Sequence, residues 1–203
     1  EGIFTALITP FKDGKVDESA LWNLVEQQIE AGIAGLVPCG STGESATLSA
    51  DEHNDVIDIV ISAAAGRVPV IAGTGSNNTR EAISFTQYAK DAGATGALLL
   101  SPYYNKPTQE GLIEHFVAIA DATQIPLMLY NIPGRTASNM LPETIARLAE
   151  HEFIVGVKEA CGDLDQISQL ISLCPSDFTV LSGDDSLLLP VMAVGGKGSI
   201  AVT

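Results

Sequence analysis

Lys158 lies in an apolar run that should exclude a charge. The run reads Ile154-Val155-Gly156-Val157-Lys158-Glu159-Ala160 and is typical of a buried β-strand. Burial disfavours the ammonium form, so a lysine in this position loses its proton more readily. The neutral amine is a nucleophile toward carbonyl compounds and can form a Schiff base. The strand alone leaves two interpretations open: a structural lysine paired with a carboxylate, or a Schiff-base lysine.

A phenol and a guanidinium follow one another in the segment Tyr130-Asn131-Ile132-Pro133-Gly134-Arg135-Thr136. Tyr130 ends a run that is typical of a strand, and its phenol can donate or accept a proton if a nearby cation lowers its pKa. Arg135 can bind a carboxylate through two parallel hydrogen bonds. A surface arginine on a loop remains the alternative for Arg135.

Two loops add polar and aromatic groups. In Gly40-Ser41-Thr42-Gly43-Glu44, the glycines let backbone amides point at an anion, and the hydroxyls can bind a carboxylate or relay protons. A tight loop that caps the next helix is the alternative. In Ser101-Pro102-Tyr103-Tyr104-Asn105-Lys106-Pro107, paired tyrosines between prolines are typical of an interface anchor, with loop packing as the alternative.

The composition restricts the partners. Ten Lys and Arg stand against 25 Asp and Glu, so the formal charge is −15. Such a surface repels phosphate backbones and anionic lipids, and we expect neither nucleic acid nor a membrane as partner. No apolar run approaches the ~20 residues of a membrane helix, and no signal segment opens the chain.

The histidines and cysteines give no metal pattern. His53, His115 and His151 lie far apart in the sequence, without ligand spacing, so we expect no metal site. The three cysteines include no Cys-x-x-Cys pair, which favours reduced thiols in a cytoplasmic protein.

These groups must be positioned by regular elements. Apolar, β-branched runs predict strands at 3–10, 35–40, 68–74, 96–101, 125–131, 154–160, 178–183 and 198–203. Helical periodicity predicts helices near 18–31, 50–65, 79–92, 109–122, 142–150, 163–173 and 185–194. Ser49 with Glu52, and Asn78 with Glu81, each fit an N-cap followed by a glutamate three residues on.

Eight strands that alternate with helices predict an α/β fold, a (β/α)₈ TIM barrel, with catalytic groups at the carboxyl ends of its strands. An open doubly wound sheet is the alternative, weakened because no Gly-x-Gly-x-x-Gly follows the first strand. We expect one catalytic barrel domain over residues 1–203, truncated at strand eight and without the last helix. Pro38 predicts an irregularity in the second strand.

Together the motifs resemble one family, the pyruvate-dependent Schiff-base lyases that include dihydrodipicolinate synthases and N-acetylneuraminate lyases. The shared marks are the segments 40–44, Tyr130-Asn131-Ile132-Pro133 and Val157-Lys158-Glu159. The resemblance covers essentially all 203 residues. The Tyr103-Tyr104 pair and Arg135 resemble the residues of the synthase branch rather than those of the N-acetylneuraminate lyase branch. The C-terminal helical domain of the family has no counterpart here, in keeping with the expected fragment.

The resemblance implies a lyase that condenses pyruvate with L-aspartate 4-semialdehyde to 4-hydroxy-tetrahydrodipicolinate, in lysine and diaminopimelate biosynthesis. Lys158 would form an imine with pyruvate, and Tyr130 would shuttle protons. Thr42 would link Tyr130 to Tyr104, which would come from a neighbouring subunit. No metal or organic cofactor is implied, because the imine is covalent.

The same resemblance implies a substrate pocket. Ser41 and Thr42 would hold the carboxylate of pyruvate, and Arg135 the carboxylate of the aldehyde. The carbonyls of Gly183 and Ile200 would line the pocket. The family more often has threonine at the position of Ser41, and the hydroxyl is kept.

The resemblance also implies regulation and assembly. Many family members are inhibited by lysine at a dimer interface, and the chain is expected to form a homo-oligomer, a dimer of dimers (a homotetramer). The positions that match the lysine site are Ser45, Ala46, His53, Asn77, Glu81 and Tyr103.

Two other functions stay open at this point. One is a related pyruvate lyase or aldolase that acts on a sugar acid such as N-acetylneuraminate, which Arg135 and Tyr104 disfavour. The other is a barrel without catalysis that serves only binding or assembly.

Overall fold

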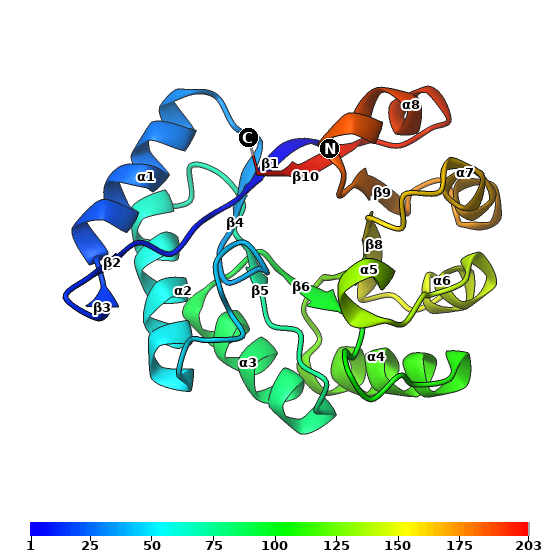
Figure 1. Ribbon diagram of the computed structural model, residues 1–203, viewed down its shortest axis with the longest axis horizontal. Coiled ribbons are helices and arrows are strands. Elements are labelled where there is room, and N and C mark those ends of the chain that lie inside the picture. Colours follow the sequence, from blue (N-terminus) through cyan, green and yellow to red (C-terminus); the bar gives the residue numbers. More distant parts are fainter. Residues whose placement is uncertain (203) are drawn as a thin grey trace.

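The computed structural model describes residues 1–202, and its eight parallel strands form a barrel (Figure 1). The strands are β1 (Gly2–Ala6), β4 (Gly35–Val37), β5 (Ile71–Gly73), β6 (Gly96–Leu100), β7 (Leu127–Asn131), β8 (Ile154–Glu159), β9 (Thr179–Ser182) and β10 (Gly198–Ala201). Their order is β4-β1-β10-β9-β8-β7-β6-β5. A bridge between Leu36 and Val70 joins β4 to the chain before β5, so the two ends of the sheet meet.

Helices surround the strands in Figure 1. They are α1 (Glu18–Glu30), α2 (Ala50–Ala64), α3 (Thr79–Ala92), α4 (Gln109–Thr123), α5 (Pro133–Thr136), α6 (Pro142–Leu148), α7 (Leu164–Leu173) and α8 (Leu188–Ala193), the last preceded by the 3₁₀ turn η1 (Asp185–Leu187). At least one helix lies between each barrel strand and the next along the chain, which confirms the predicted (β/α)₈ architecture. None of the described helices is long and apolar enough to cross a bilayer.

Helix ends follow from local chemistry. Ser49 and Glu52 form the predicted reciprocal capping box at the start of α2. The matching prediction for Asn78 and Glu81 is wrong in its second half. The Asn78 side chain accepts a hydrogen bond from the backbone N–H of Arg80, but the Glu81 carboxylate accepts from the Ser76 hydroxyl instead. The Glu81 side chain therefore bonds the loop before α3 instead of capping the helix.

Two short elements were not predicted. A two-stranded hairpin, β2 (Phe11–Lys12) and β3 (Lys15–Val16), follows β1, and the four-residue helix α5 follows β7. Both are too short for hydrophobic periodicity to reveal. The irregularity expected at Pro38 lies outside a strand, because β4 ends at Val37 and the Pro38 carbonyl accepts from the Gly73 N–H at 2.9 Å.

A β-bulge in β8 decides which side chains of this strand enter the barrel. Leu127 pairs with Ile154, but Met128 pairs with Gly156, so one extra residue lies between them. That residue, Val155, is 40% exposed. Ile154 packs in the layer between the sheet and the helices. The bulge reverses the alternation after it, so Gly156 and the residue two positions further, Lys158, turn inward.

The barrel interior is a small apolar cluster beneath the carboxyl ends of the strands. Its members all come from strands and are Phe4, Ala6, Val37, Leu98, Met128, Tyr130, Leu181 and Ile200. A larger cluster between the sheet and helices α4, α6 and α7 holds the outer face of β6, β7 and β8. The site residues on these strands are therefore fixed from both sides.

Candidate active site

Lys158 is the penultimate residue of β8, paired in register with Tyr130 of β7 and Leu181 of β9. The lysine is only 6% exposed, and its Nζ lies 4.4 Å from the centroid of the Tyr130 ring. Burial lowers the Lys158 pKa to about 8; the negative charge of Asp185 opposes this shift and the positive charge of Arg135 adds to it. Roughly one tenth of the amine is then uncharged at pH 7.

The contact described for the Lys158 amine is with an aromatic ring. The four ion pairs found within residues 1–202 join other residues, while the negative charge of Asp185 acts on the amine. The Nζ faces the ring of Tyr130.

Gly183 provides the space for the Lys158 side chain. A β-carbon at position 183 would stand 2.9 Å from Lys158 Cε and 2.8 Å from Ala160 Cβ. The absence of a side chain at Gly183 therefore lets the lysine stem lie against the end of β9. The space at Gly156, one layer below, is closed by Thr179 of β9, whose carbonyl oxygen would be 2.5 Å from a β-carbon there, and by the methyl group of Met128 at 3.3 Å.

Tyr130 is buried beside the amine. Burial raises the pKa of its phenol, while the charge of Arg135 and a hydrogen bond with the Ser41 side chain lower it by less. The positive charge of Arg135 lowers the Tyr130 pKa, as the sequence suggested that a nearby cation could. Burial raises this pKa by more. The phenol is therefore protonated at neutral pH and can donate a proton.

Arg135 lies at the C-terminal end of α5 and is exposed. The helix begins with Pro133 at its first position, and Thr136 anchors it because the buried Thr136 hydroxyl donates to the carbonyls of Ile132 and Ser138, at 3.1 and 2.9 Å. Arg135 also lines a cleft of about 660 Å³ at the mouth of the barrel. The cleft gives this cation access to a small anionic ligand.

The Ser41-Thr42 loop is tied to the segment that follows β1. The buried Thr9 hydroxyl donates to the Gly43 carbonyl at 2.7 Å. Ser41 lines the cleft beside Arg135, and its side chain lowers the pKa of the Tyr130 phenol, while Thr42 is half-buried. Within residues 1–202 the Thr42 hydroxyl forms no hydrogen bond, so the relay from Thr42 to Tyr130 and Tyr104 stays a prediction.

Tyr104 does not join the site of its own chain. Its side chain is 88% exposed, and its backbone has a φ of 75°. The loop is held by its neighbours: Asn77 Nδ2 donates to the Tyr103 carbonyl at 3.1 Å, and Asn105 Nδ2 donates to the Asn77 carbonyl at 3.2 Å. The structure therefore presents Tyr104 outward on a tethered loop.

The residues matched to the lysine site gather around the same cleft as Arg135. The cleft-lining members of this set are Ser45, Ala46, His53, Glu81 and Tyr103. Asn77 does not line the cleft but contacts Tyr103 through its amide. His53 is buried, stacks on Phe85 with 4.3 Å between ring centroids, and has no partner for its Nδ1 within the described chain. A ligand in this part of the cleft would approach Arg135.

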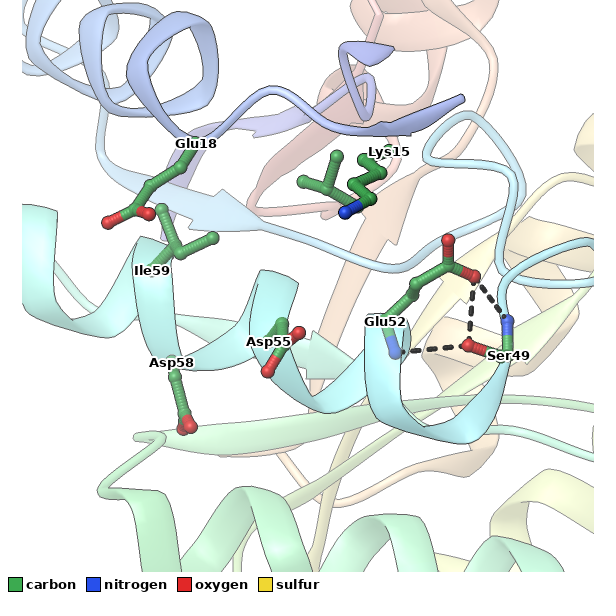
Figure 2. Close-up of a pocket in the computed structure, with 8 residues that line it drawn as sticks. Lys15, Glu18, Ser49, Glu52, Asp55, Asp58 and Ile59 are labelled. Carbon is green, nitrogen blue, oxygen red and sulfur yellow. Dashed lines mark hydrogen bonds between the residues drawn. The ribbon is translucent and has the colours of Figure 1, made fainter. Parts of the chain in front are cut away.

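A second cleft of about 610 Å³ lies away from the barrel mouth, between the β2–β3 hairpin, α1 and α2. Figure 2 shows its acidic lining of Glu18, Glu52, Asp55 and Asp58, opposite Lys15. Glu52 is bound to Ser49 in the capping box, and Asp58 accepts from the Tyr88 hydroxyl at 2.6 Å. The acidic lining of this cleft repels anions. The barrel mouth, with the cations Lys158 and Arg135, is therefore the better candidate site for anionic substrates.

Two site residues escaped the sequence analysis. Asp185 acts electrostatically on Lys158, while the neighbouring Asp184 caps η1. Glu159, noticed only as part of a motif, is buried behind the lysine and bonded to Asn131. Their positions at the carboxyl ends of β9 and β8 were the available signal. Residues 1–202 contain no cluster of three His, Cys, Asp or Glu side chains placed to hold a metal ion.

Comparisons with known proteins agree with this geometry. Residues 1–203 match the Dihydrodipicolinate synthetase family. A 4-hydroxy-tetrahydrodipicolinate synthase of Nitratidesulfovibrio vulgaris (strain DP4) is 60% identical over the whole chain. This chain spans 70% of the length of that relative.

Solved structures show the same barrel. A dihydrodipicolinate synthase from Aquifex aeolicus matches with a TM-score of 0.98 and 50% identity, over 99% of this chain and 69% of that one. A dihydrodipicolinate synthase from Acinetobacter baumannii, described as complexed with pyruvate, matches with a TM-score of 0.97 and 50% identity over the same shares. The fold, the buried lysine and the match over every residue lead to one conclusion: the chain belongs to the dihydrodipicolinate synthetase family.

Proposed function

We propose that this chain is the catalytic barrel of a 4-hydroxy-tetrahydrodipicolinate synthase, a lyase that condenses pyruvate with L-aspartate 4-semialdehyde. The observation that carries the proposal is the buried Lys158 amine with its pKa lowered to about 8, beside the Tyr130 ring and within reach of the positive charge of Arg135. The name of the 60% identical relative supports the same activity.

The first half of the proposed reaction activates pyruvate. The neutral Lys158 amine attacks the ketone carbon, and loss of water gives an imine. The Tyr130 phenol is placed to donate a proton to the departing hydroxyl, a contribution typically worth ~10²–10⁴ in rate. The protonated imine withdraws electrons, so the methyl carbon loses a proton and an enamine forms.

The second half joins the two substrates. The enamine carbon attacks the aldehyde carbon, and the imine forms again. The amino group of the aldehyde substrate then adds to the imine carbon and expels the Lys158 amine, which closes the ring. Arg135 holds the carboxylate of the aldehyde substrate, and Ser41 and Thr42 hold that of pyruvate. Lys158 supplies the electron sink, so the proposal needs no metal or organic cofactor.

A lyase that acts on a sugar acid is the weaker alternative. Arg135 at the cleft suits a second substrate with a compact carboxylate, and the name of the close relative supports the synthase. Turnover of pyruvate with aspartate semialdehyde, compared with turnover of N-acetylneuraminate, separates the two activities. Faster turnover of the sugar acid would reverse the assignment.

We further propose that the enzyme works as a homo-oligomer in the cytoplasm and that lysine controls it. The exposed Tyr104 supports assembly, and the three free cysteines suit a reducing compartment. The cleft that joins His53 and Glu81 to Arg135 supports regulation. A titration of activity with L-lysine tests this last point, and a flat response would reject it.

Borohydride trapping tests the central proposal. Incubation with pyruvate and sodium borohydride should reduce the imine to a stable adduct, which peptide mass spectrometry should place on Lys158. The Lys158→Ala variant should form no adduct. Absence of an adduct in the unmodified chain, or equal trapping by the variant, would refute Schiff-base chemistry at this position.

A further inference from the structure

A buried polar cluster lies directly behind the two site cations, on the outer side of the barrel wall. Its centre is Glu159, which is 1% exposed, next to Asn131, which is fully buried. Asn131 Nδ2 donates to both carboxylate oxygens of Glu159, at 3.0 and 3.1 Å, and the Cys161 N–H donates to one of them at 2.9 Å. In each of these contacts a carboxylate oxygen of Glu159 accepts the hydrogen bond.

The cluster continues into the segment after α5. Asn131 Oδ1 accepts from the Met140 N–H at 3.0 Å, and Asn131 Nδ2 also donates to Asn139 Oδ1 at 2.8 Å. Asn139 and Gln166 of α7 exchange two side-chain hydrogen bonds, at 2.8 and 3.2 Å. The segment between Asn131 and Met140 is thereby closed into a loop, and Arg135 lies within it.

The same cluster also adjoins Lys158. Asn131 and Glu159 are register partners, one residue beyond the paired Tyr130 and Lys158. The Glu159 carbonyl accepts from the Gly183 N–H at 2.7 Å, which places the glycine against the lysine stem. One carboxylate therefore connects the strand that carries Lys158 to the loop that carries Arg135.

We propose that Glu159 is a positioning residue, whose carboxylate holds the Arg135 loop at the distance from Lys158 that the second substrate requires. This inference rests on the proposed function, because it assigns Arg135 to the aldehyde and Lys158 to pyruvate. Glu159 touches neither substrate and acts through Asn131.

The two cations depend on the cluster to different degrees. Lys158 is held by backbone pairing with β7 on one side and β9 on the other, which survives the loss of a side chain. The Arg135 loop pairs with no strand and is held by side-chain contacts, namely those of the cluster, of the Thr136 hydroxyl and of Gln109, which bonds the Asn139 carbonyl and the Leu141 N–H. Weakening the cluster should therefore impair use of the aldehyde more than formation of the pyruvate imine.

The Glu159→Gln variant tests this with almost no change of shape. The new amide must present one NH₂ group to a site where Asn131 Nδ2 and the Cys161 N–H both donate. Asn131 cannot turn over to compensate without losing the hydrogen bond from Met140. We expect KM for the aldehyde to rise about tenfold or more, while KM for pyruvate and borohydride trapping change by about twofold or less.

An exchange variant distinguishes a positioning role from general loss of structure. Combining Asn131→Asp with Glu159→Gln returns a carboxylate beside an amide, with the two groups swapped. KM for the aldehyde should fall at least about threefold relative to Glu159→Gln alone. The exposed Glu152→Gln serves as the matched control, and thermal melts followed by circular dichroism check folding.

The outcomes separate the two proposals. An unmodified chain that forms no pyruvate adduct would refute the proposed function itself. An active unmodified chain, with a folded Glu159→Gln variant whose two KM values are unchanged or rise equally, would refute only the positioning role. If Glu159→Gln does not fold, the exchange variant decides: a folded exchange variant with unaltered kinetics supports the role, and one in which both KM values rise equally overturns it.

Discussion

At the level of single residues, the chemistry depends on where the few positive charges lie. The chain carries −15 formal charge, yet Arg135 stands close enough to Lys158 and Tyr130 for its positive charge to lower the pKa of both groups. An acidic protein repels anionic substrates overall, and the two cations Lys158 and Arg135 offset that repulsion locally. The buried Lys158 amine gains its reactivity from desolvation, because water no longer stabilises its charged form.

Imine formation should follow the ionisation of Lys158. Burial depresses the pKa to about 8, so the nucleophilic neutral amine is complete above that pH and scarce below it. At subsaturating pyruvate, the initial rate of imine formation should rise about tenfold per pH unit below 8 and level off above it. Stopped-flow or quenched trapping with borohydride measures this. A rate that keeps rising past pH 10 would show an ordinary, solvated lysine.

Arg135 should matter for one substrate only. The Arg135→Ala variant loses a charge-assisted contact to the aldehyde carboxylate, worth on the order of 1.5–3 kcal/mol, or about tenfold to a hundredfold. Steady-state kinetics should show this loss in kcat/KM for aspartate semialdehyde and little change in the trapping of pyruvate. Equal losses for both substrates would contradict the assignment.

At the level of elements, the lysine is aimed by features of its neighbouring strands. The bulge at Val155 turns the inner face of β8 toward the barrel axis, and the bare Gly183 at the end of β9 leaves room for the stem. The buried Glu159 then fastens the end of β8 to the loop after β7. Three local features thus place a single side chain.

The Gly183→Ala variant should displace the lysine. The added methyl would meet Lys158 Cε at 2.9 Å and Ala160 Cβ at 2.8 Å, both too close for a real contact. Overpacking of this kind costs about 1–3 kcal/mol of folding free energy. Borohydride trapping should slow by about tenfold if the amine moves off the reactive position.

Gly111→Ala is the control for this experiment. Its added methyl would meet only ordinary contacts, the nearest at 3.4 Å. Thermal melts and trapping assays on both variants make the comparison. Unaltered trapping in a stable Gly183→Ala protein would show that the lysine stem does not depend on this glycine.

At the level of the whole molecule, one predicted catalytic group faces away from its own barrel. Tyr104 stands on a loop tethered by Asn77 and Asn105 and is almost fully exposed. Large exposed aromatics on ordered loops are typical of protein interfaces. A site shared between two copies of the chain would explain why hydrogen bonds hold this loop while the Tyr104 side chain on it is exposed.

Complementation tests a shared site. Lys158→Ala chains lack the nucleophile, and Tyr104→Phe chains should lose most activity if the phenol relays protons. Co-refolded or co-expressed mixtures should recover up to about a quarter of full activity, because some mixed pairs contain one native site. Recovery is read from steady-state assays. Mixtures no more active than their separate parents would place Tyr104 outside its partner's site.

Local sequence signals located most of the barrel. The apolar runs, the Ser49 capping box and Pro142 at the start of α6 depend on neighbours within a few residues, and the structure confirms them. The hairpin after β1 and the helix α5 were missed because both are shorter than any periodic signal. Glu81 was assigned to the wrong partner because Ser76 competes with the cap for its carboxylate.

The sequence by itself determined the order of strands and helices and the candidate chemistry of Lys158, Tyr130 and Arg135, because residue types and spacing are properties of the chain. Only the tertiary structure decided that Lys158 turns inward, that Gly183 makes room for it, that Tyr104 faces outward and that the Glu159 carboxylate bonds Asn131 on the neighbouring strand. Those facts depend on a register shift and on contacts between segments distant in sequence, where packing and desolvation, and not local preference, select the arrangement.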